Sequence, residues 1–396
     1  MHILFSSLAH YGHIFPMLPL AVAAARRGHR VGYAVDKALH PTLSALGLEP
    51  IAAGISLAEA FGRGGEQLFG AQVDRQEMTP AQAEHHVMVT FGSVLPRSYA
   101  ADLGEVFTRF RPDLLVYDSV CPGAAVAAEL AGIPALCHGL GHRELNTLTP
   151  EYVSQVHEFA AGLGLDLSPG DLNPLGHPYL DIYPPSLQDQ EFRAEARRIE
   201  LRPVPFAQPG GPPVGLRLSG RTRPLIYLTL GTEAGAEGAG DVLRQAVRGL
   251  AVLDADVLVA VGPKLTLETV GPVPENVFLR SWVPQADLLP HLDLVVHHAG
   301  SGTTLGSLSH GLPQLVMPRG ADQFINARLI LTAGAGERLL PAEFTFSAVT
   351  EIAARLMAGK EYREAAGRIS REIALMPSPT EVATRLPDLV AELKAS

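Results

Sequence analysis

Short apolar runs alternate with longer amphipathic segments along the first half of this 396-residue chain. Continuous apolar runs of strand length occur at HILFSS, RVGYAV, DLLVYD and PALCH. The segments over residues 14–27 and 122–131 have helical length, and each is followed by glycine, a residue that commonly ends helices. Strands separated by helices of this kind are typical of βαβ units, so the pattern predicts a parallel sheet.

The same alternation returns in the second half, after a change in composition. Residues 203–224 are rich in proline and glycine and have no helical period, which is typical of an interdomain linker. Beyond them, strand patterns occur at LIYLTLG, DVLVAVG, LDLVVHH and PQLVMP, and helical patterns cover residues 241–252, 302–310, 324–333, 362–375 and 381–394. The chain is therefore predicted to be an α/β protein with two Rossmann-like domains.

These patterns set the expected domain boundaries. We expect an N-terminal domain over residues 1–205, a linker over 206–223, a C-terminal domain over 224–375 and a final helical segment over 376–396. Ligands of such sheets bind at the carboxyl ends of the strands, so we expect the two domains to face each other across a ligand-binding cleft.

Composition and charge indicate which partners to expect. Apolar residues make up 47% of the chain, enough for two sizeable cores. The formal net charge of −10 argues against nucleic acid or an anionic membrane as a partner, so small molecules are the expected ligands. Cys121 and Cys137 are the only cysteines, which argues against a disulfide framework or a cysteine zinc site. The start of the chain lacks the basic residues of a signal peptide, and no run reaches the ~18 apolar residues of a membrane span, so a cytoplasmic protein is expected.

The stretch VVHHAGSGTT carries the first candidate chemistry. It combines an apolar strand, a glycine turn and the start of a helix. Gly300 and Gly302 allow a ligand to approach the backbone closely, while the free N–H groups and the dipole of the helix favour an anion. His298 lies where it can donate a hydrogen bond to the same anion. The loop is thus a candidate phosphate site.

Two other interpretations of this loop remain open on the residues alone. Gly300, Gly302 and Gly306 also fit a dinucleotide fingerprint, with Asp322 at the distance expected of a ribose-binding acid. Against this, the loop follows a late strand of its domain and Asp322 lies beyond the next strand. A glycine-rich turn without a ligand is the second alternative.

The neighbouring motifs favour one of these interpretations. WVPQ, with the only tryptophan of the chain, precedes the loop, and PRGADQ follows it. The combined pattern WVPQ…HHAGSGTTL…HGLPQLVMPRGADQ resembles the donor signature of family 1 glycosyltransferases of the GT-B fold. The similarity is greatest to the bacterial type that decorates antibiotics and other natural products, such as enediynes and macrolides. In that family the tryptophan stacks on the nucleobase, the histidine and glycine loop hold the diphosphate, and the Asp-Gln pair binds the sugar. The family's C-terminal helix also crosses back onto the N-terminal domain, and we expect the same of residues 376–396.

The resemblance implies a set of donor-binding residues. They are Thr232, Trp282, Val283, Gln285, His298, Gly300, Ser301, Gly302, Thr303, Asp322 and Gln323. A neutral or cationic imidazole beside a helix N-terminus can stabilise a departing nucleoside diphosphate, so neither a metal nor a resident cofactor is expected. Plant members carry a glutamate for the ribose hydroxyls where this chain has Gly306. We therefore expect a thymidine diphosphate (TDP) sugar rather than a uridine diphosphate (UDP) sugar. The sugar itself is expected to be a deoxysugar.

A general base is the second requirement for sugar transfer. His13 follows the first predicted strand in a G-H-x-x-P setting that resembles that of the family's catalytic histidine, and Asp118 ends a later strand, where the family places the partner carboxylate. A carboxylate on one imidazole nitrogen fixes the tautomer and leaves the other nitrogen to accept a proton. On the residues alone, each is equally consistent with an ordinary polar group at a loop end.

The acceptor site is expected in the N-terminal domain, which supplies this base. Residues 57–91 are its least regular stretch, and four apolar side chains there are candidates for lining an aromatic or polyketide-like site: Phe61, Phe69, Met88 and Phe91. Ordinary core packing explains each of them equally well. His142 follows a strand and is a fifth candidate, whereas His85 and His86 are expected on an exposed or mobile segment.

Other metal and cofactor motifs are weak. Asp254 and Asp256 have D-x-D spacing but precede a strand, which favours a turn. His10 with His13, and His138 with His142, have no third ligand nearby in sequence. The sequence thus predicts an inverting, metal-independent glycosyltransferase acting on a small-molecule hydroxyl. The alternatives are a nucleotide-sugar epimerase or hydrolase of related fold, and an inactive member that serves as a binding partner. A homodimer is left open.

Overall fold

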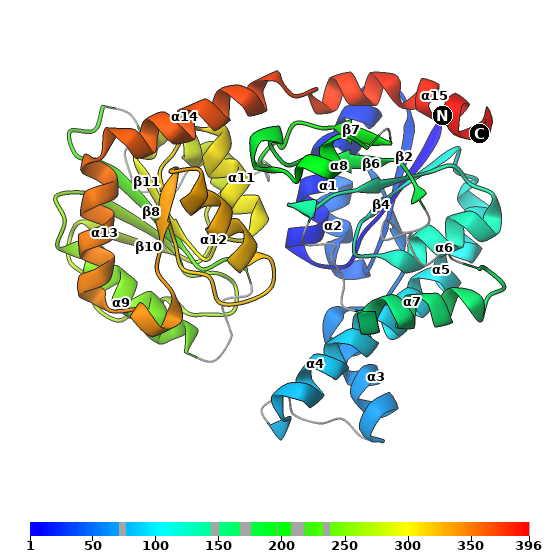
Figure 1. The fold of residues 1–396 in the computed structure, drawn as a ribbon, viewed down its shortest axis with the longest axis horizontal. Helices are drawn as coiled ribbons and strands as arrows, with labels where there is room; N and C mark the ends of the chain where they lie inside the picture. The colour runs from blue at the N-terminus through cyan, green and yellow to red at the C-terminus, as the bar shows by residue number, and fades with distance from the viewer. Residues whose placement is uncertain are drawn as a thin grey trace. The chain divides into compact units, whose positions relative to one another are not determined.

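The computed structural model describes residues 1–70, 77–143, 150–166, 176–195, 197–206, 218, 220–232 and 238–395. These residues form two compact units (Figure 1). The first unit comprises Met1–Ile182, Asp189–Leu201 and Pro377–Ser396, and the second comprises Tyr183–Gln188 and Arg202–Met376. Most of the predicted linker, residues 207–217 and 219, lies outside the described residues.

A parallel sheet forms the centre of the first unit. In the described part of the chain its strands run in the order β3-β2-β1-β4-β5-β6-β7. Their bounds are β1 His2–Ser6, β2 Arg30–Val35, β3 Glu49–Ala52, β4 Leu114–Asp118, β5 Ala135–His138, β6 Tyr179–Asp181 and β7 Arg198–Glu200. The central strands are buried on both faces, which explains why they are continuous apolar runs rather than alternating ones.

Helices cover both faces of this sheet. Their bounds are α1 Tyr11–Arg26, α2 His40–Ala45, α3 Leu57–Phe69, α4 Pro80–Val89, α5 Leu95–Phe110, α6 Pro122–Ala131, α7 Pro150–Ala161, α8 Gln190–Arg193 and α15 Pro379–Ala395, with a short 3₁₀ turn at Lys37–Leu39. The 3₁₀ turn at Pro185–Leu187 belongs to the second unit. A π-helical turn at Thr90–Val94 joins α4 to α5. Although α15 ends the chain, it packs against α1 in the first unit.

The second unit repeats the architecture with the strand order β10-β9-β8-β11-β12-β13 over the residues described. Its strands are β8 Leu225–Thr229, β9 Asp256–Ala260, β10 Val277–Arg280, β11 Leu294–His297, β12 Gln314–Val316 and β13 Gly336–Arg338. Its helices are α9 Ala239–Ala251, α10 Gln285–Leu288, α11 Ser301–Ser309, α12 Gln323–Thr332, α13 Phe346–Ala358 and α14 Lys360–Leu375, with 3₁₀ turns at Leu267–Thr269, Leu289–His291 and Pro341–Glu343.

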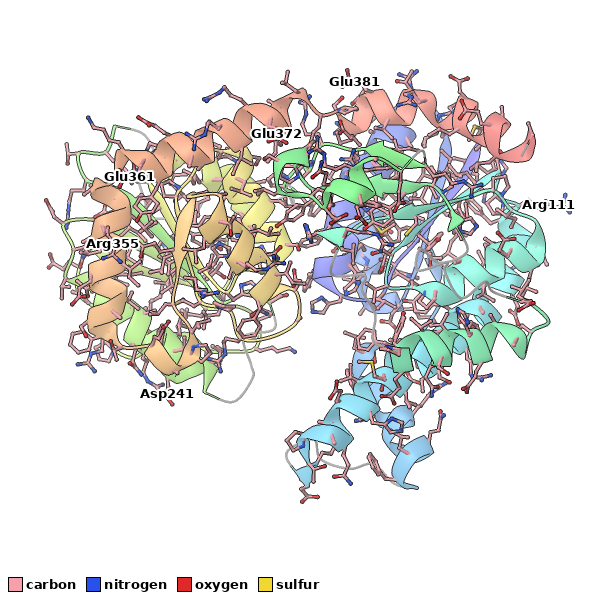
Figure 2. All side chains as sticks on the ribbon, in the orientation of Figure 1. Arg111, Asp241, Arg355, Glu361, Glu372 and Glu381 are labelled. Carbon is pink, nitrogen blue, oxygen red and sulfur yellow. The ribbon has the colours of Figure 1, made fainter. Side chains whose placement is uncertain are left out.

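The prediction of an α/β protein with two Rossmann-like domains is confirmed. Local signals set several helix ends. The predicted helix over 122–131 ends at Gly132, whose φ of 62° lies in the left-handed region that glycine tolerates. Arg111, labelled in Figure 2, ends α5 in the same region with a φ of 52°.

The expectation of an irregular stretch over residues 57–91 is wrong, because its described residues are largely helical. Ser56 caps α3 through the N–H of Glu59. The glycines of FGRGGEQLFG, which read as helix breakers, serve close packing instead: a Cβ on Gly64 would lie 2.6 Å from Thr90 Oγ1. Close approach between helices therefore outweighs the low helix propensity of glycine here.

Candidate active site

The first cluster lies at the carboxyl edge of the first sheet. His13 is in the first turn of α1, which follows β1, and Asp118 is the last residue of the adjacent strand β4. The carboxyl ends of parallel neighbours meet at one edge, so residues 105 positions apart come together. His13 Nδ1 lies 2.9 Å from Asp118 Oδ2. The structure thus brings together the two residues that the sequence proposed as a pair.

The surroundings of Asp118 keep it ionised. Burial by itself raises the pKa of this fully buried carboxyl, but the charge and hydrogen bond of His13 and the N–H groups of Leu8 and Val120 outweigh it and hold the pKa below its usual value. Leu8 N donates to Oδ2 at 3.0 Å and Val120 N to Oδ1 at 2.6 Å. An ionised carboxylate only accepts hydrogen bonds, so His13 Nδ1 carries the hydrogen and Nε2 is left free to accept a proton.

The second cluster lies in the second unit, at the turn between β11 and α11. Ala299 occupies the left-handed region with a φ of 69°, which is strained for a residue with a Cβ. Two side chains hold it there: Ala299 N donates to His297 Nδ1 at 3.1 Å, and Asn326 Nδ2 donates to Ala299 O at 2.8 Å. The turn ends at Gly300, and Ser301 begins α11.

Asp322 holds the first turn of α11. Its Oδ2 accepts hydrogen bonds from Ser301 N at 3.0 Å, Ser301 Oγ at 2.7 Å and Asn326 Nδ2 at 2.9 Å. A carboxylate at a helix N-terminus is favoured by the helix dipole. Among the described residues, no hydrogen bond reaches the other oxygen, Oδ1, which remains available to a ligand.

Gln323 fixes the preceding turn. Its Oε1 accepts from Arg319 N at 2.8 Å and from Gly320 N at 3.2 Å. With the oxygen engaged, the amide nitrogen is the group left to contact a sugar. Ala321, with a φ of 51°, is a second strained residue in this segment, so both turns of the candidate donor site hold left-handed alanines.

His298 is enclosed by two glycines. A Cβ on Gly231 would lie 2.5 Å from the Cε1 atom of the ring, and a Cβ on Gly300 would lie 2.5 Å from Nε2. Burial lowers the pKa of His298 to about 4, so the imidazole is neutral at neutral pH. Of the two forms that the sequence allowed, a neutral hydrogen-bond donor is the one that this environment favours.

The remaining predicted donor residues surround the same loop. Gln285 Nε2 donates to Thr303 Oγ1 at 3.2 Å, and Val283 is buried in the core beside α10. Trp282 is 39% exposed, so part of its side chain is open to solvent. A Cβ on Gly302 would meet nothing within 4 Å, which leaves open space over the N-terminus of α11. Thr232 is partly buried and follows the end of β8.

The predicted acceptor residues divide into two places in the first unit. Phe61, Phe69 and Phe91 gather around His86, with ring centroids 5.3 Å apart for Phe61–His86, 6.2 Å for Phe69–His86 and 6.1 Å for Phe61–Phe91. His86 is buried, and its Nε2 lies 2.7 Å from Phe61 O, so the expectation of an exposed His86 is wrong. Met88 is partly buried, and His142 is buried in the turn after β5.

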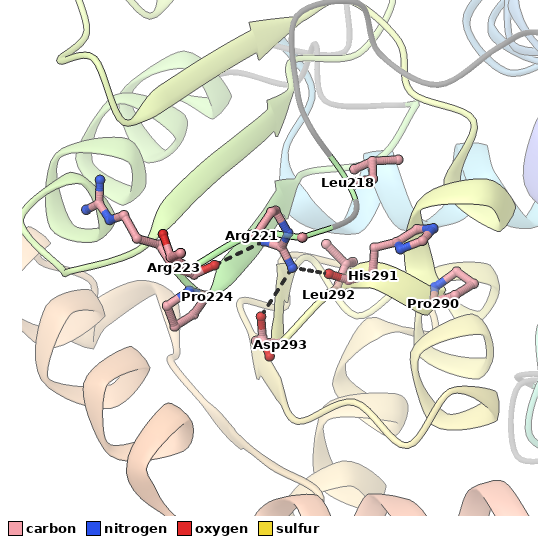
Figure 3. Close-up of a pocket in the computed structure, with 10 residues that line it drawn as sticks. Leu218, Arg221, Arg223, Pro224, Pro290, His291, Leu292 and Asp293 are labelled. Atoms are coloured by element: carbon pink, nitrogen blue, oxygen red, sulfur yellow. Dashed lines mark hydrogen bonds and ion pairs between the residues drawn. The ribbon is translucent and has the colours of Figure 1, made fainter.

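A pocket in the second unit lies elsewhere. Figure 3 shows that it is lined by residues just before β8 and β11, with Arg221 bonded to His291 O and paired with Asp293 at 3.5 Å. These are the amino ends of the strands, whereas the donor loop follows the carboxyl end of β11. The pocket is therefore separate from the candidate donor site.

The aspartates of the D-x-D motif are paired with an arginine. Asp254 and Asp256 pair with Arg223 at 3.0 and 3.6 Å. The described residues contain no group of three or more His, Cys, Asp or Glu side chains placed to hold a metal ion. None of the described helices is both long and apolar enough to span a membrane.

Sequence reasoning missed two supporting residues. Asn326 joins Ala299, Ser301 and Asp322, and Tyr183 OH donates to Asn326 Oδ1 at 2.9 Å. Asn326 could have been found from the sequence, because it lies one helical turn after Asp322 and so on the same face of the helix. Tyr183 is distant in sequence, and no local pattern identifies it.

The comparisons with known proteins agree with this arrangement. Two parallel α/β units of this kind are those of the GT-B fold. The family model described as "Erythromycin biosynthesis protein CIII-like, C-terminal domain" matches residues 244–389. The chain is similar to elloramycin glycosyltransferase ElmGT of Streptomyces olivaceus, with 34% identity over 95% of this chain and 94% of the relative. It is also similar to L-demethylnoviosyl transferase of Streptomyces niveus, with 31% identity over 98% and 97% of the two chains.

A solved structure extends the likeness to the whole fold. Glycosyltransferase SsfS6 of Streptomyces sp. SF2575, complexed with thymidine diphosphate, has a TM-score of 0.74 and 25% identity, covering 98% of this chain and 99% of that one. The chain belongs to the bacterial natural-product glycosyltransferases. Membership of this family favours glycosyl transfer over the epimerase or hydrolase that the sequence left open.

Proposed function

We propose that this glycosyltransferase moves a sugar from a TDP-sugar, without a metal ion and with inversion, to a hydroxyl group of a small natural product. The observation that carries the proposal is the His13–Asp118 pair, in which a buried carboxylate orients a partly exposed imidazole. The donor half of the proposal rests on the β11–α11 loop with His298, Asp322 and Gln323. We further propose that the sugar is a deoxysugar.

In the proposed reaction, His13 Nε2 removes the proton of the acceptor hydroxyl. The hydroxyl oxygen forms a bond to the anomeric carbon as the bond from that carbon to the diphosphate oxygen breaks, which inverts the configuration. Asp118 stabilises the imidazolium that forms. The leaving nucleoside diphosphate gains negative charge, which the N–H groups of α11 and neutral His298 are suited to stabilise as hydrogen-bond donors.

The proposed preference for TDP rests on position 306. A Cβ on Gly306 would lie 3.0 Å from Leu289 Cδ1, 3.5 Å from Pro205 Cγ and 4.0 Å from Gln285 Oε1. No carboxylate extends from this position, and the packing leaves little space for one. Without an acceptor at this position, the ribose 2′-hydroxyl of UDP makes no hydrogen bond here. The deoxyribose of TDP, which lacks that hydroxyl, therefore binds without a penalty. The related structure with bound thymidine diphosphate supports the same preference.

Calorimetric titration with TDP and UDP, without metal, tests the donor half. Wild type should bind TDP more tightly than UDP. Trp282→Ala should weaken TDP about 5- to 100-fold, because stacking a base on an aromatic ring contributes ~1–3 kcal/mol. His13→Ala should bind TDP as wild type does and lose about 10²- to 10⁴-fold in turnover, the usual contribution of a general base.

Each half of the proposal has its own contrary result. Unchanged TDP affinity in Trp282→Ala would contradict the assigned base site. UDP binding as tight as TDP would contradict the donor preference alone. Unchanged turnover in His13→Ala would contradict the assigned general base while leaving the donor site intact.

A further inference from the structure

A second histidine lies beside Asp118 at the carboxyl end of the first sheet. His138 ends β5, and its Cα is the register partner of Asp118 in the adjacent parallel strand β4. Register partners in parallel strands are about 4.8 Å apart and direct their side chains to the same face. His138 is therefore the nearest sheet neighbour of the His13–Asp118 pair on that face.

The backbone around His138 fixes which nitrogen carries its hydrogen. Nδ1 lies 2.7 Å from Gly139 O. A carbonyl oxygen only accepts hydrogen bonds, so Nδ1 donates and Nε2 presents a lone pair. Gly139 is held in turn by the bond from its N–H to Leu180 O at 2.9 Å, so the acceptor of Nδ1 is itself in a fixed position.

The lone pair of Nε2 is buried without a donor. His138 is 0% exposed, and among the described residues no donor hydrogen-bonds to Nε2. Burial lowers the pKa of His138 to about 4, so the nitrogen keeps its lone pair at neutral pH. Buried polar atoms of folded proteins are nearly always satisfied, and internal water supplies the bond where no protein group does.

Asp118 has capacity for one more donor. Within the described part of the chain, its Oδ2 accepts from His13 and Leu8, whereas Oδ1 accepts from Val120 alone. An ionised carboxylate offers about four lone-pair positions. Water has two hydrogens, and one molecule can bridge polar side chains on strands about 4.8 Å apart. Asp118 is also close enough for its charge to raise the pKa of the His138 ring against the effect of burial.

We propose that one buried water molecule donates to both His138 Nε2 and Asp118 Oδ1, so that His138 acts as a positioning residue for the His13–Asp118 pair. The bridge gives Oδ1 a second donor beside Val120 N and limits the rotation of the carboxylate. It also spreads the carboxylate's charge over a further donor. The catalytic consequence rests on the proposed function, whereas the water site itself does not.

A high-resolution crystal structure of the wild-type protein tests the water site directly. The expected result is ordered water density about 2.7–3.2 Å from both Nε2 and Oδ1. Well-defined side chains at His138 and Asp118 without such density would overturn the inference. This result is independent of turnover, so it is separate from any failure of His13 as the base.

Two variants separate the two nitrogens of His138. In His138→Asn the amide nitrogen replaces Nδ1–H and keeps the bond to Gly139, but no acceptor extends as far as Nε2. In His138→Gln the amide oxygen reaches that position and restores the acceptor. If His138 matters only through its bond to Gly139, the His138→Asn variant should be closer to wild type. If the water bridge matters, His138→Gln should be closer to wild type.

Steady-state kinetics with TDP-glucose and umbelliferone, a fluorescent phenol, as probe substrates distinguish the two roles. The kcat of His138→Asn should fall about tenfold with KM nearly unchanged, because the carboxylate that orients His13 loses a hydrogen-bond donor. Its kcat/KM profile should shift to higher pH on the acid side, because a carboxylate with one donor fewer binds the His13 proton more strongly. His138→Gln should recover both. Wild-type kinetics in His138→Asn, or a glutamine variant no better than asparagine, would overturn the positioning role.

Discussion

Histidines at the carboxyl ends of the two sheets differ in what surrounds the imidazole. His13 is partly exposed and paired with an ionised carboxylate, so it is suited to accept a proton. His297 and His298 are neighbours in sequence, and burial lowers their pKa values to about 3 and about 4. The same side chain is thus suited to act as a base in one unit and as a neutral hydrogen-bonding group in the other.

The buried His297 makes stability depend on pH. Its Nδ1 accepts from Ala299 N and its Nε2 lies 2.8 Å from Gln314 Oε1, an arrangement that suits only the neutral ring. In the unfolded chain His297 takes up a proton near its ordinary pKa of 6.5, whereas in the folded chain it does so only near 3. Between these values the unfolded state binds one more proton, so stability falls as pH falls.

His297→Asn tests this contribution, since its Oδ1 can still accept from Ala299 N. The variant should be less stable than wild type at pH 7.5 because it loses the bond to Gln314. The difference should shrink by up to about 1.4 kcal/mol per pH unit below pH 6.5, the free energy of one proton per unit. Urea unfolding followed by circular dichroism at several pH values measures it. A difference that stays constant down to pH 4 would contradict a buried neutral His297.

At the scale of elements, the donor loop depends on glycines that make room for a ring. Gly231, after β8, has a φ of 82°, and a Cβ there would overlap the His298 ring. Gly28, after α1, has a similar φ of 85°, but a Cβ there would meet nothing within 4 Å. The two glycines share a left-handed backbone conformation, and they differ in whether an added Cβ would contact another side chain.

Gly231→Ala and Gly28→Ala therefore form a matched pair. Each substitution should cost roughly 1–2 kcal/mol for a left-handed residue with a Cβ, so both should lower the melting temperature modestly. Only Gly231→Ala should weaken TDP binding, by tenfold or more, because His298 must move. Calorimetry with TDP and thermal melts measure both effects. Equal TDP affinity in the two variants would show that the position of His298 does not matter for binding.

The elements also show what could be predicted from the sequence. Strand patterns and glycine caps were sufficient for α1, β4 and α6, because these elements follow local rules. The helices α3 and α4 were missed because Gly64 is explained only by its contact with Thr90 across helices. Likewise the motifs identified Asp322, but its bonds to Ser301 and Asn326 depend on tertiary structure.

At the scale of the whole molecule, the last helix belongs to the first unit. Ser378 and Glu381 (the latter labelled in Figure 2) cap α15, with Ser378 Oγ donating to Glu381 Oε2 at 2.7 Å. One face of the helix is buried, namely Val382, Ala383, Leu386, Leu389 and Val390. Because α15 packs against α1, which carries His13, the end of the chain supports the candidate general base.

Leu386→Ala and Leu375→Ala test that support. Leu386 is fully buried in α15, whereas Leu375 is 86% exposed at the end of α14. Truncating a buried leucine costs about 2–5 kcal/mol, so Leu386→Ala should lower the thermal transition of the first unit, while Leu375→Ala should leave it unchanged. Circular dichroism follows both units, and fluorescence of Trp282, the only tryptophan, follows the second unit alone. A fluorescence transition that stays in place while the dichroism transition falls would assign the loss to the first unit. Equal melting of the two variants would mean that α15 contributes little to the unit that carries the base.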